Sequence, residues 1–147
     1  KTPMKWYTKL RLVLCLIGIA ALGIYWCVDR YTPHPLLEGA LIHQVQYVSV
    51  WKDGVKQDVT ERTDRTELLP LLKQCERRLA FPWEGRREEE VLQQSPVEVC
   101  FIGKLDDGFD WRMLVGPEET VALDPKGRWY LITGGEAMWQ SLAPLLE

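Results

Sequence analysis

Asparagine is missing from the 147-residue sequence, and histidine occurs only twice. Without asparagine the chain has no site for N-glycosylation. His34 lies between two prolines, and His43 lies in a β-like segment beside a glutamine. Neither histidine has a partner at the spacing that a catalytic triad or a zinc site needs. We therefore expect both to be surface or packing residues, and we predict no metal and no cofactor.

The short motifs that mark common enzyme classes are also missing. The sequence has no C-x-x-C pair, no G-x-S-x-G elbow, no P-loop and no dinucleotide-binding glycine pattern. Asp106, Asp107 and Asp110 surround Gly108, but a calcium loop would need a glutamate about six residues past the glycine, where Leu114 stands. We interpret this segment as a hairpin turn and predict no catalytic residue in the chain.

Basic charge is scarce outside the N-terminal segment. Residues 31–147 contain 13 basic and 20 acidic side chains, which gives this part a net charge of about −7. A nucleic-acid-binding surface needs a stripe of lysines and arginines that displaces counterions from phosphates. The composition therefore argues against a nucleic-acid partner.

Charge is absent from Leu12 to Val28, a run of seventeen residues. As a helix this run is at the short end of what spans a hydrocarbon core about 30 Å thick. The remaining chain is too small to bury so apolar a helix inside a soluble protein. Aromatic residues flank the run on both sides, as expected at membrane interfaces. We predict a transmembrane helix over 12–28, with the lipid bilayer as its partner.

The basic residues around this run are unevenly placed. Four precede it, at positions 1, 5, 9 and 11, whereas Arg30 beside Asp29 is all that follows closely. The positive-inside rule then makes residues 1–11 a cytoplasmic tail and places the rest of the chain outside. The alternative is a cleaved signal peptide with small residues around Ala21-Leu22-Gly23, although apolar residues continue beyond that cut.

The rest of the chain has the pattern of a small α+β domain. We predict a proline-stiffened juxtamembrane spacer over 29–40 and an extracytoplasmic domain over 41–147. Asp-Gly at 53–54 between two β-branched runs predicts a hairpin. The pattern predicts an antiparallel β-sheet with two helices packed on one face. The expected strands cover 42–51, 55–60, 96–103, 109–115, 120–123 and 128–132, and the expected helices cover 67–79 and 136–146, with 80–96 the least structured part.

The first of these helices also bears on the cysteines. Thr66 is the expected N-cap, because it places Pro70 in the first turn, where a missing N–H costs nothing. Cys75 shares a face with Leu68 and Leu72 and should point to the sheet. On the strand after it, Cys100 alternates with the apolar residues that should face the helices, so it should point away. We therefore predict that Cys75 and Cys100 form no disulfide.

The order of hairpin, helix, strand meander and closing helix resembles a known class of protein. The residues that carry the likeness are 47–54 (YVSVWKDG) and 128–132 (RWYLI), each followed by a helix. The pattern is similar to small membrane-anchored extracytoplasmic domains of unknown function from Gram-positive Bacillota. The resemblance implies a cell-surface location and names no activity. The long segment 80–95 and the position of Pro144 depart from the compact form of that pattern.

One segment has the composition of a binding site for another protein. Phe81, Trp83, Arg86 and Arg87 follow one another in the longest connection of the domain, and tryptophan and arginine are enriched in interface hot spots. We predict a non-catalytic, membrane-tethered interaction or sensing domain that binds another surface or membrane protein here. Alternatively, Trp83 folds back over the sheet edge. Two other functions stay open: a glycan or cell-wall binding module that uses exposed aromatics, and a small wall-active hydrolase.

Overall fold

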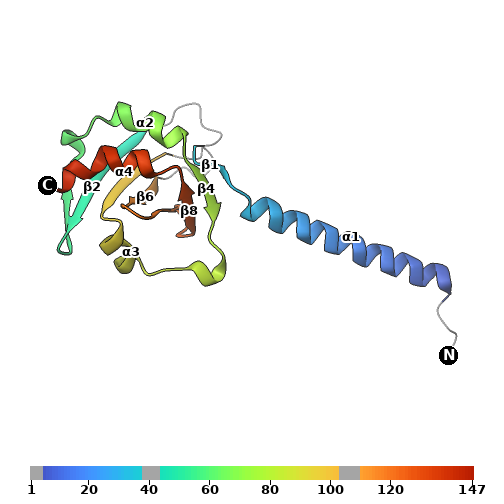
Figure 1. The fold of residues 1–147 in the computed structure, drawn as a ribbon. Coiled ribbons are helices and arrows are strands. Elements are labelled where there is room, and N and C mark those ends of the chain that lie inside the picture. Colours follow the sequence, from blue (N-terminus) through green and yellow to red (C-terminus); the bar gives the residue numbers. More distant parts are fainter. Residues whose placement is uncertain (1–4, 38–43, 103–109) are drawn as a thin grey trace. The chain divides into compact units, whose positions relative to one another are not determined.

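The computed structural model describes residues 5–37, 44–102 and 110–147. It divides into two compact units, residues 1–32 and residues 33–147. The first unit contains one long helix, and the second contains a sheet with shorter helices on both of its faces (Figure 1). The α+β class predicted from the sequence is confirmed.

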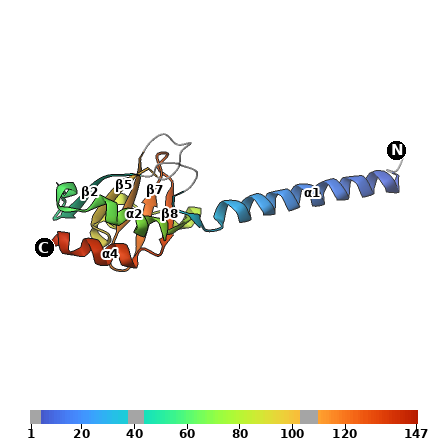
Figure 2. The same cartoon turned by 90° about the horizontal axis from the view of Figure 1, so that it is seen from above.

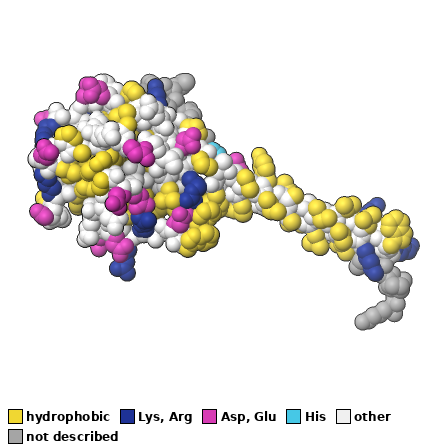
Figure 3. All heavy atoms as spheres, in the orientation of Figure 1, with side chains coloured by type: hydrophobic (Ala, Val, Ile, Leu, Met, Phe, Trp, Pro, Cys, Tyr) yellow, Lys and Arg dark blue, Asp and Glu magenta, His cyan; other side chains and the backbone are white. Residues whose placement is uncertain are grey.

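The first unit is the helix α1, which runs from Trp6 to Tyr31. Its 26 residues are apolar and long enough to cross a membrane, and none of its side chains is buried within the protein. Figure 3 shows hydrophobic side chains along its whole length and lysine or arginine near its N-terminal end. The predicted run 12–28 is therefore the centre of a longer helix. Length and composition fit a membrane span, and a signal sequence would meet the same criteria.

The second unit is built on an antiparallel sheet of eight strands among the described residues. Their order across the sheet is β1-β4-β8-β7-β6-β5-β2-β3, so the sheet is open and ends in β1 on one side and β3 on the other. The strands are β1 (His34–Pro35), β2 (Val45–Lys52), β3 (Val55–Asp58), β4 (Glu76–Leu79), β5 (Val97–Phe101), β6 (Trp111–Val115), β7 (Thr120–Leu123) and β8 (Trp129–Thr133).

Helices cover both faces of this sheet. The helices α2 (Arg65–Lys73) and α4 (Glu136–Leu142) contact each other on one face (Figures 1 and 2), as the sequence predicted. The helix α3 (Glu88–Gln94) packs on the other face, where Val91 joins Leu114 and Val121 in a small apolar cluster. Single 3-10 turns lie at Thr60–Arg62 (η1), Pro82–Glu84 (η2) and Ala143–Leu146 (η4).

The main core lies between the sheet and the pair α2 and α4. Strand pairing sets Val48, Val99 and Met113 in one row across β2, β5 and β6, and all three side chains are buried. Leu72 from α2 and Met138 from α4 are buried as well. Because side chains alternate across a strand, residues 98, 100 and 112 point to the opposite face. Cys100 therefore points away from α2 and α4, as expected, and the thiols of Cys75 and Cys100 are both free.

The hairpin predicted at Asp53-Gly54 is confirmed. Lys52 pairs with Val55, which leaves a two-residue loop. Asp53 has a φ of 53° and Gly54 a φ of 78°, so both central residues are in the left-handed region. Two positive φ values in a two-residue loop define a type I′ turn, and aspartate followed by glycine is a favoured pair for that turn.

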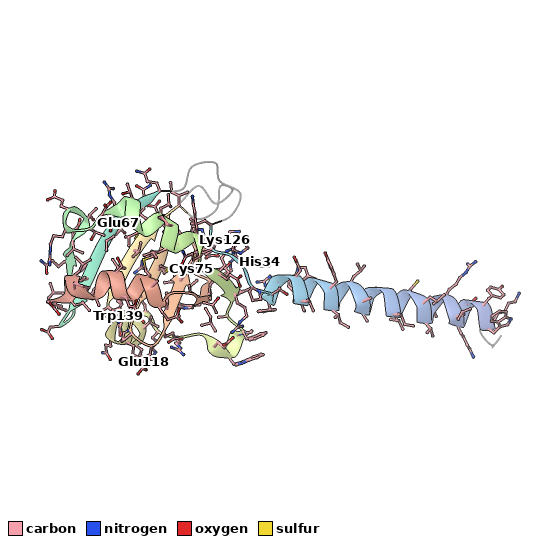
Figure 4. All side chains as sticks on the ribbon, turned by 45° about the horizontal axis from the view of Figure 1, so that its top comes forward. His34, Glu67, Cys75, Glu118, Lys126 and Trp139 are labelled. Atoms are coloured by element: carbon pink, nitrogen blue, oxygen red, sulfur yellow. The ribbon has the colours of Figure 1, made fainter. Side chains whose placement is uncertain are left out.

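The predicted helix 67–79 is wrong at both ends. It begins two residues earlier, because Asp64 rather than Thr66 is the N-cap and accepts a hydrogen bond from the Thr66 N–H. Pro70 consequently lies inside the helix instead of in its first turn. The helix ends at Lys73, and Cys75 follows it (Figure 4). Residues 76–79 form β4, in which Arg77 and Leu79 alternate as buried residues with a strand period.

The ranges predicted as spacer and as loop contain further structure. Within 29–40, α1 continues to Tyr31 and β1 pairs with β4. Leu36 is buried, and its N–H donates to the carbonyl oxygen of Cys75. Within 80–96, where the sequence predicted little structure, the chain forms η2 and α3. His43, Asp106 and Asp107 lie outside the described residues.

Candidate interaction surface

Among the described residues of the second unit, the most exposed large apolar side chain is Trp83, which is 79% exposed. It lies in η2, directly after β4 and before α3. Its ring stacks on the ring of Phe81 with 4.7 Å between the centroids and 3° between the planes. Figure 3 shows hydrophobic side chains gathered at the surface where Figure 1 draws this segment. We call the two stacked rings the aromatic ledge. Trp83 therefore does not fold back over the sheet edge.

The ledge is held by a network that starts on β4. The Arg78 guanidinium donates through two nitrogens to the two carboxylate oxygens of Glu84, each at 3.1 Å. Glu84 also accepts a hydrogen bond from the Phe81 N–H at 2.9 Å, and its own N–H donates to the Phe81 carbonyl oxygen. Arg78 lies 4.9 Å over the Phe81 ring as well. Phe81 is thus fixed by its backbone and by its ring, and it supports Trp83.

This network also sets the charge state of Glu84. The hydrogen bonds from Arg78, and then the one from the Phe81 N–H, lower the pKa of the Glu84 carboxyl below its usual value. Glu84 therefore stays ionised through the neutral pH range, and the two-point pair with Arg78 persists. A ledge held in this way loses little side-chain entropy when a partner packs on it.

The two predicted arginines have different surroundings. Arg86 forms an ion pair with Glu119, which directly precedes β7. Arg87 is the N-cap residue of α3 and is exposed. Among the described residues Arg87 makes none of the ion pairs, so its guanidinium is open to a carboxylate from outside. The structure thus brings Phe81 and Trp83 into contact, while Arg86 turns toward a groove.

The groove lies between α3 and the ends of β6, β7 and β8 and has a volume of about 710 Å³. Its lining mixes apolar and charged side chains: Arg86, Glu88, Asp110, Arg112, Leu123, Asp124, Pro125, Gly127 and Trp129. The acidic groups are mostly engaged. Glu88 pairs with Arg112, and Asp124 is buried and accepts from the Arg128 side chain and the Tyr130 hydroxyl.

A buried carboxylate that the sequence did not predict lies on the same face of the sheet as α3. Glu98 has no exposed surface, and it accepts hydrogen bonds from Arg112 Nε at 2.7 Å and from Trp51 Nε1 at 3.1 Å. The Lys56 ammonium lies 3.6 Å from the second carboxylate oxygen. Burial by itself would raise the pKa of Glu98, but the Arg112, Trp51 and Lys56 interactions outweigh it and lower the pKa. Glu98 is thus held as an anion.

The thiol beside this carboxylate is not activated. Cys100 Sγ lies 3.6 Å from Glu98 Oε1, and burial raises the pKa of Cys100 to about 11. The pKa of Tyr47 is raised as well, chiefly by its hydrogen bond to Cys100 and then by burial. A thiol nucleophile needs a lowered pKa, so this cluster contributes structure and offers no nucleophile. The feature of the sequence that indicates this cluster is Glu98, a glutamate in the middle of an alternating apolar strand.

The residues weighed for metal chemistry give no cluster. His34 lies in β1 at the start of the sheet (Figure 4) and is half-buried. Asp110 is exposed at the rim of the groove. No group of three or more metal-binding side chains occurs in residues 5–37, 44–102 and 110–147.

The comparisons with known proteins add no relative. The chain matches no protein-family model, and the searches of curated proteins and of solved structures returned no match.

Proposed function

We propose that this chain is a single-pass membrane protein whose second unit is a non-catalytic, extracytoplasmic interaction domain. In this proposal α1 is the membrane span, residues 1–11 are cytoplasmic and residues 33–147 lie outside. The length and apolar composition of α1 support the span, and the basic residues before it support the orientation. The partner is another surface or membrane protein, bound at the aromatic ledge and the arginines after it.

The observation that carries this proposal is the exposure of Trp83 on a fixed support. The Trp83 side chain is 79% exposed, so most of its apolar surface is removed from water only when a partner packs on it. The frame of Arg78, Glu84 and Phe81 holds the ring without burying it. Such rigid exposed tryptophans beside arginines are typical of the few residues that dominate binding energy in protein interfaces.

The two other functions receive less support from the geometry. A glycan module would be favoured by a cleft lined by several aromatic rings, but Trp129 is the one aromatic residue among the described residues that line the groove. A hydrolase would be favoured by two carboxylates poised across a deep cleft. Glu88 and Asp124 are instead engaged by Arg112 and Arg128, so neither is arranged to donate a proton.

The test is partner capture with matched exposed-residue variants. Full-length protein is expressed as wild type, as Trp83→Ala and as Val55→Ala, and partners are quantified by mass spectrometry after crosslinking in cells. Val55 is the control, because it is 66% exposed and apolar but lies on the edge strand β3. We expect Trp83→Ala to reduce recovery of a specific partner tenfold or more, as loss of a hot spot does, and Val55→Ala to leave it unchanged. Equal recovery in all three would refute the proposed surface.

Orientation has its own test. Protease added outside intact cells should digest residues 33–147 and leave α1 in the membrane. Survival of the second unit in intact cells, with digestion only after lysis, would reverse the orientation.

A further inference from the structure

The floor of the groove is a row of three side chains on neighbouring strands. Arg112 on β6 is opposite Leu123 on β7, and Leu123 is opposite Trp129 on β8. Side chains opposite each other in antiparallel strands point to the same face, so all three lie on the face that carries α3. Leu123 is buried, and Trp129 is partly exposed. The floor therefore offers an aliphatic and an aromatic surface beside a guanidinium.

The charges around this guanidinium cancel. Arg112 forms ion pairs with Glu98 and with Glu88. The Lys56 ammonium lies 3.6 Å from the second carboxylate oxygen of Glu98. Two cations thus neutralise two carboxylates, and this part of the groove attracts neither sign of charge.

The remaining charges leave one carboxylate without a counterion. Arg86 pairs with Glu119, and Asp124 pairs with Arg128. Asp110 is exposed at the rim of the groove, and among the described residues it takes part in none of the ion pairs. Among the described residues that line the groove, the uncompensated charge is therefore a single negative one.

This lining matches the side chain of a lysine or an arginine. Such a side chain packs its methylene stem on apolar surface while its charged end stays close to a counterion. In the groove the stem would lie on Leu123 and Trp129, and the charged end would face Asp110. The face of a tryptophan ring also attracts a cation. The net charge of about −7 on residues 31–147 further favours the approach of a basic segment.

The groove continues the surface that begins at the aromatic ledge. Trp83 of the ledge and Arg86, which lines the groove, are three residues apart, and three residues span at most about 10 Å. An extended segment of roughly six residues spans about 20 Å. One segment of a partner is therefore long enough to cover the ledge and to reach into the groove.

We infer that the partner bound at the ledge inserts a lysine or arginine side chain into the groove, where its charged end pairs with Asp110. An apolar side chain of the same segment packs on Trp83. The inference rests on the proposed function, because it specifies the chemistry of the segment that binds this surface. A partner that binds the ledge alone is the competing outcome.

The experiment first changes the charge of Asp110 in the full-length protein, and it measures partner recovery after crosslinking in cells. We expect Asp110→Asn to lower recovery at least fivefold, and Asp110→Lys to lower it further because like charges repel. Asp110→Glu keeps the charge and should retain most of the recovery. Asp53→Asn is the matched control: it removes the same charge from an exposed turn, and asparagine followed by glycine also favours a type I′ turn.

A photocrosslinker then identifies the residue that enters the groove. Benzoylphenylalanine replaces Lys126 in one variant and Trp83 in another. Lys126 is exposed and lies in the chain between Pro125 and Gly127, which line the groove. After irradiation, mass spectrometry maps the adducts. We expect the two variants to label one segment of the same partner, at positions within roughly six residues of each other, and this segment to contain a lysine or an arginine.

The other outcomes separate this inference from the proposed function. If Trp83→Ala lowers recovery and Asp110→Asn does not, the groove inference is refuted and binding at the ledge stands. The groove inference also fails if Asp53→Asn lowers recovery as much as Asp110→Asn, because the effect is then a general attraction to an acidic unit. A Lys126 adduct on a segment without a basic residue, or an adduct from the Trp83 variant alone, would refute it as well. If neither Trp83→Ala nor Asp110→Asn lowers recovery, both proposals fail.

Discussion

Replacement of Trp111 by alanine should be among the most damaging single changes in the second unit. Trp111 is 1% exposed on β6 and contacts the Tyr130 ring, with 5.1 Å between the centroids. It also lies 5.1 Å from the Arg77 guanidinium, which is nearly buried on β4. The change therefore opens a cavity in the core and removes one of the two rings that face a buried cation, since Tyr130 remains at 5.5 Å.

The expected cost follows from these contacts. Truncation of a buried aromatic to alanine typically costs about 3–5 kcal/mol, and aromatic pairs contribute about 0.5–1.5 kcal/mol beyond the area they bury. We expect the upper half of the first range, about 4–5 kcal/mol. Because whole domains are stable by only about 5–15 kcal/mol, the variant should be close to unfolding. With a urea m value of about 1–3 kcal/mol/M, a loss of 4 kcal/mol lowers the midpoint by roughly 1.3–4 M.

The measurement is urea unfolding of residues 33–147, monitored by circular dichroism. Trp83→Ala is the matched control, because the same truncation at a 79% exposed site should cost less than about 1 kcal/mol. If Trp111→Ala does not fold, Trp111→Phe should fold with an intermediate loss. A cost below about 1 kcal/mol for Trp111→Ala, with an unchanged m value, would show that this face of β6 is not the core. Unfolding by Trp83→Ala would show that the ledge is part of the core.

Four further outcomes are expected. Residues 33–147 should unfold in one cooperative step; two separate transitions would contradict a single unit. The full-length protein should stay in membranes through alkaline carbonate washing with residues 12–28 still present; release with a new N-terminus near Ile24 would favour the signal peptide. Because its pKa is lowered from 4.5 in the folded state, Glu98 should contribute stability above about pH 4.5 that is lost as the pH falls through the folded value, and Glu98→Gln should flatten that decline. Denatured, non-reduced 33–147 should titrate two thiols per monomer, and none in monomeric protein would prove a Cys75–Cys100 bridge.

The parts of the fold that follow a simple period could be predicted from the sequence. Strands β5 and β6 have an apolar residue at every second position, and the Asp53-Gly54 turn is fixed by local backbone preferences. Strand β4 was not predicted, because Glu76 to Leu79 continues a helical pattern and contains two adjacent arginines, which do not suggest a buried strand. Arg77 is buried there with its guanidinium over two aromatic rings from β6 and β8, which are distant in sequence, and its Nε donates to the Pro35 carbonyl oxygen.

The candidate site could also be predicted from the sequence only in part. The composition of 81–87 left open whether Trp83 is exposed or covers the sheet edge, and it did not indicate the stacked ring of Phe81 or the Arg78–Glu84 pair that holds the ledge. Helix α3 was missed because it buries little beyond Val91 and opens with three glutamates. The Glu98 network was missed because its partners lie 47 and 14 residues away along the chain. Pairings of this kind depend on strand register, which no local pattern encodes.

The pairing of β1 with β4 shortens the free chain between α1 and the sheet, because residues 33–37 are held at the sheet edge. Residues 33–37 are held at the sheet edge by a two-residue strand, by the Leu36 N–H bond to Cys75 and by the buried Leu36 side chain. An edge strand this short is among the first elements to open locally. If it detached while the other seven strands stayed paired, five residues would be freed, and the tether would lengthen by about 17 Å. A pull on α1 would then open the pairing of β1 with β4 before it reached the core of the sheet.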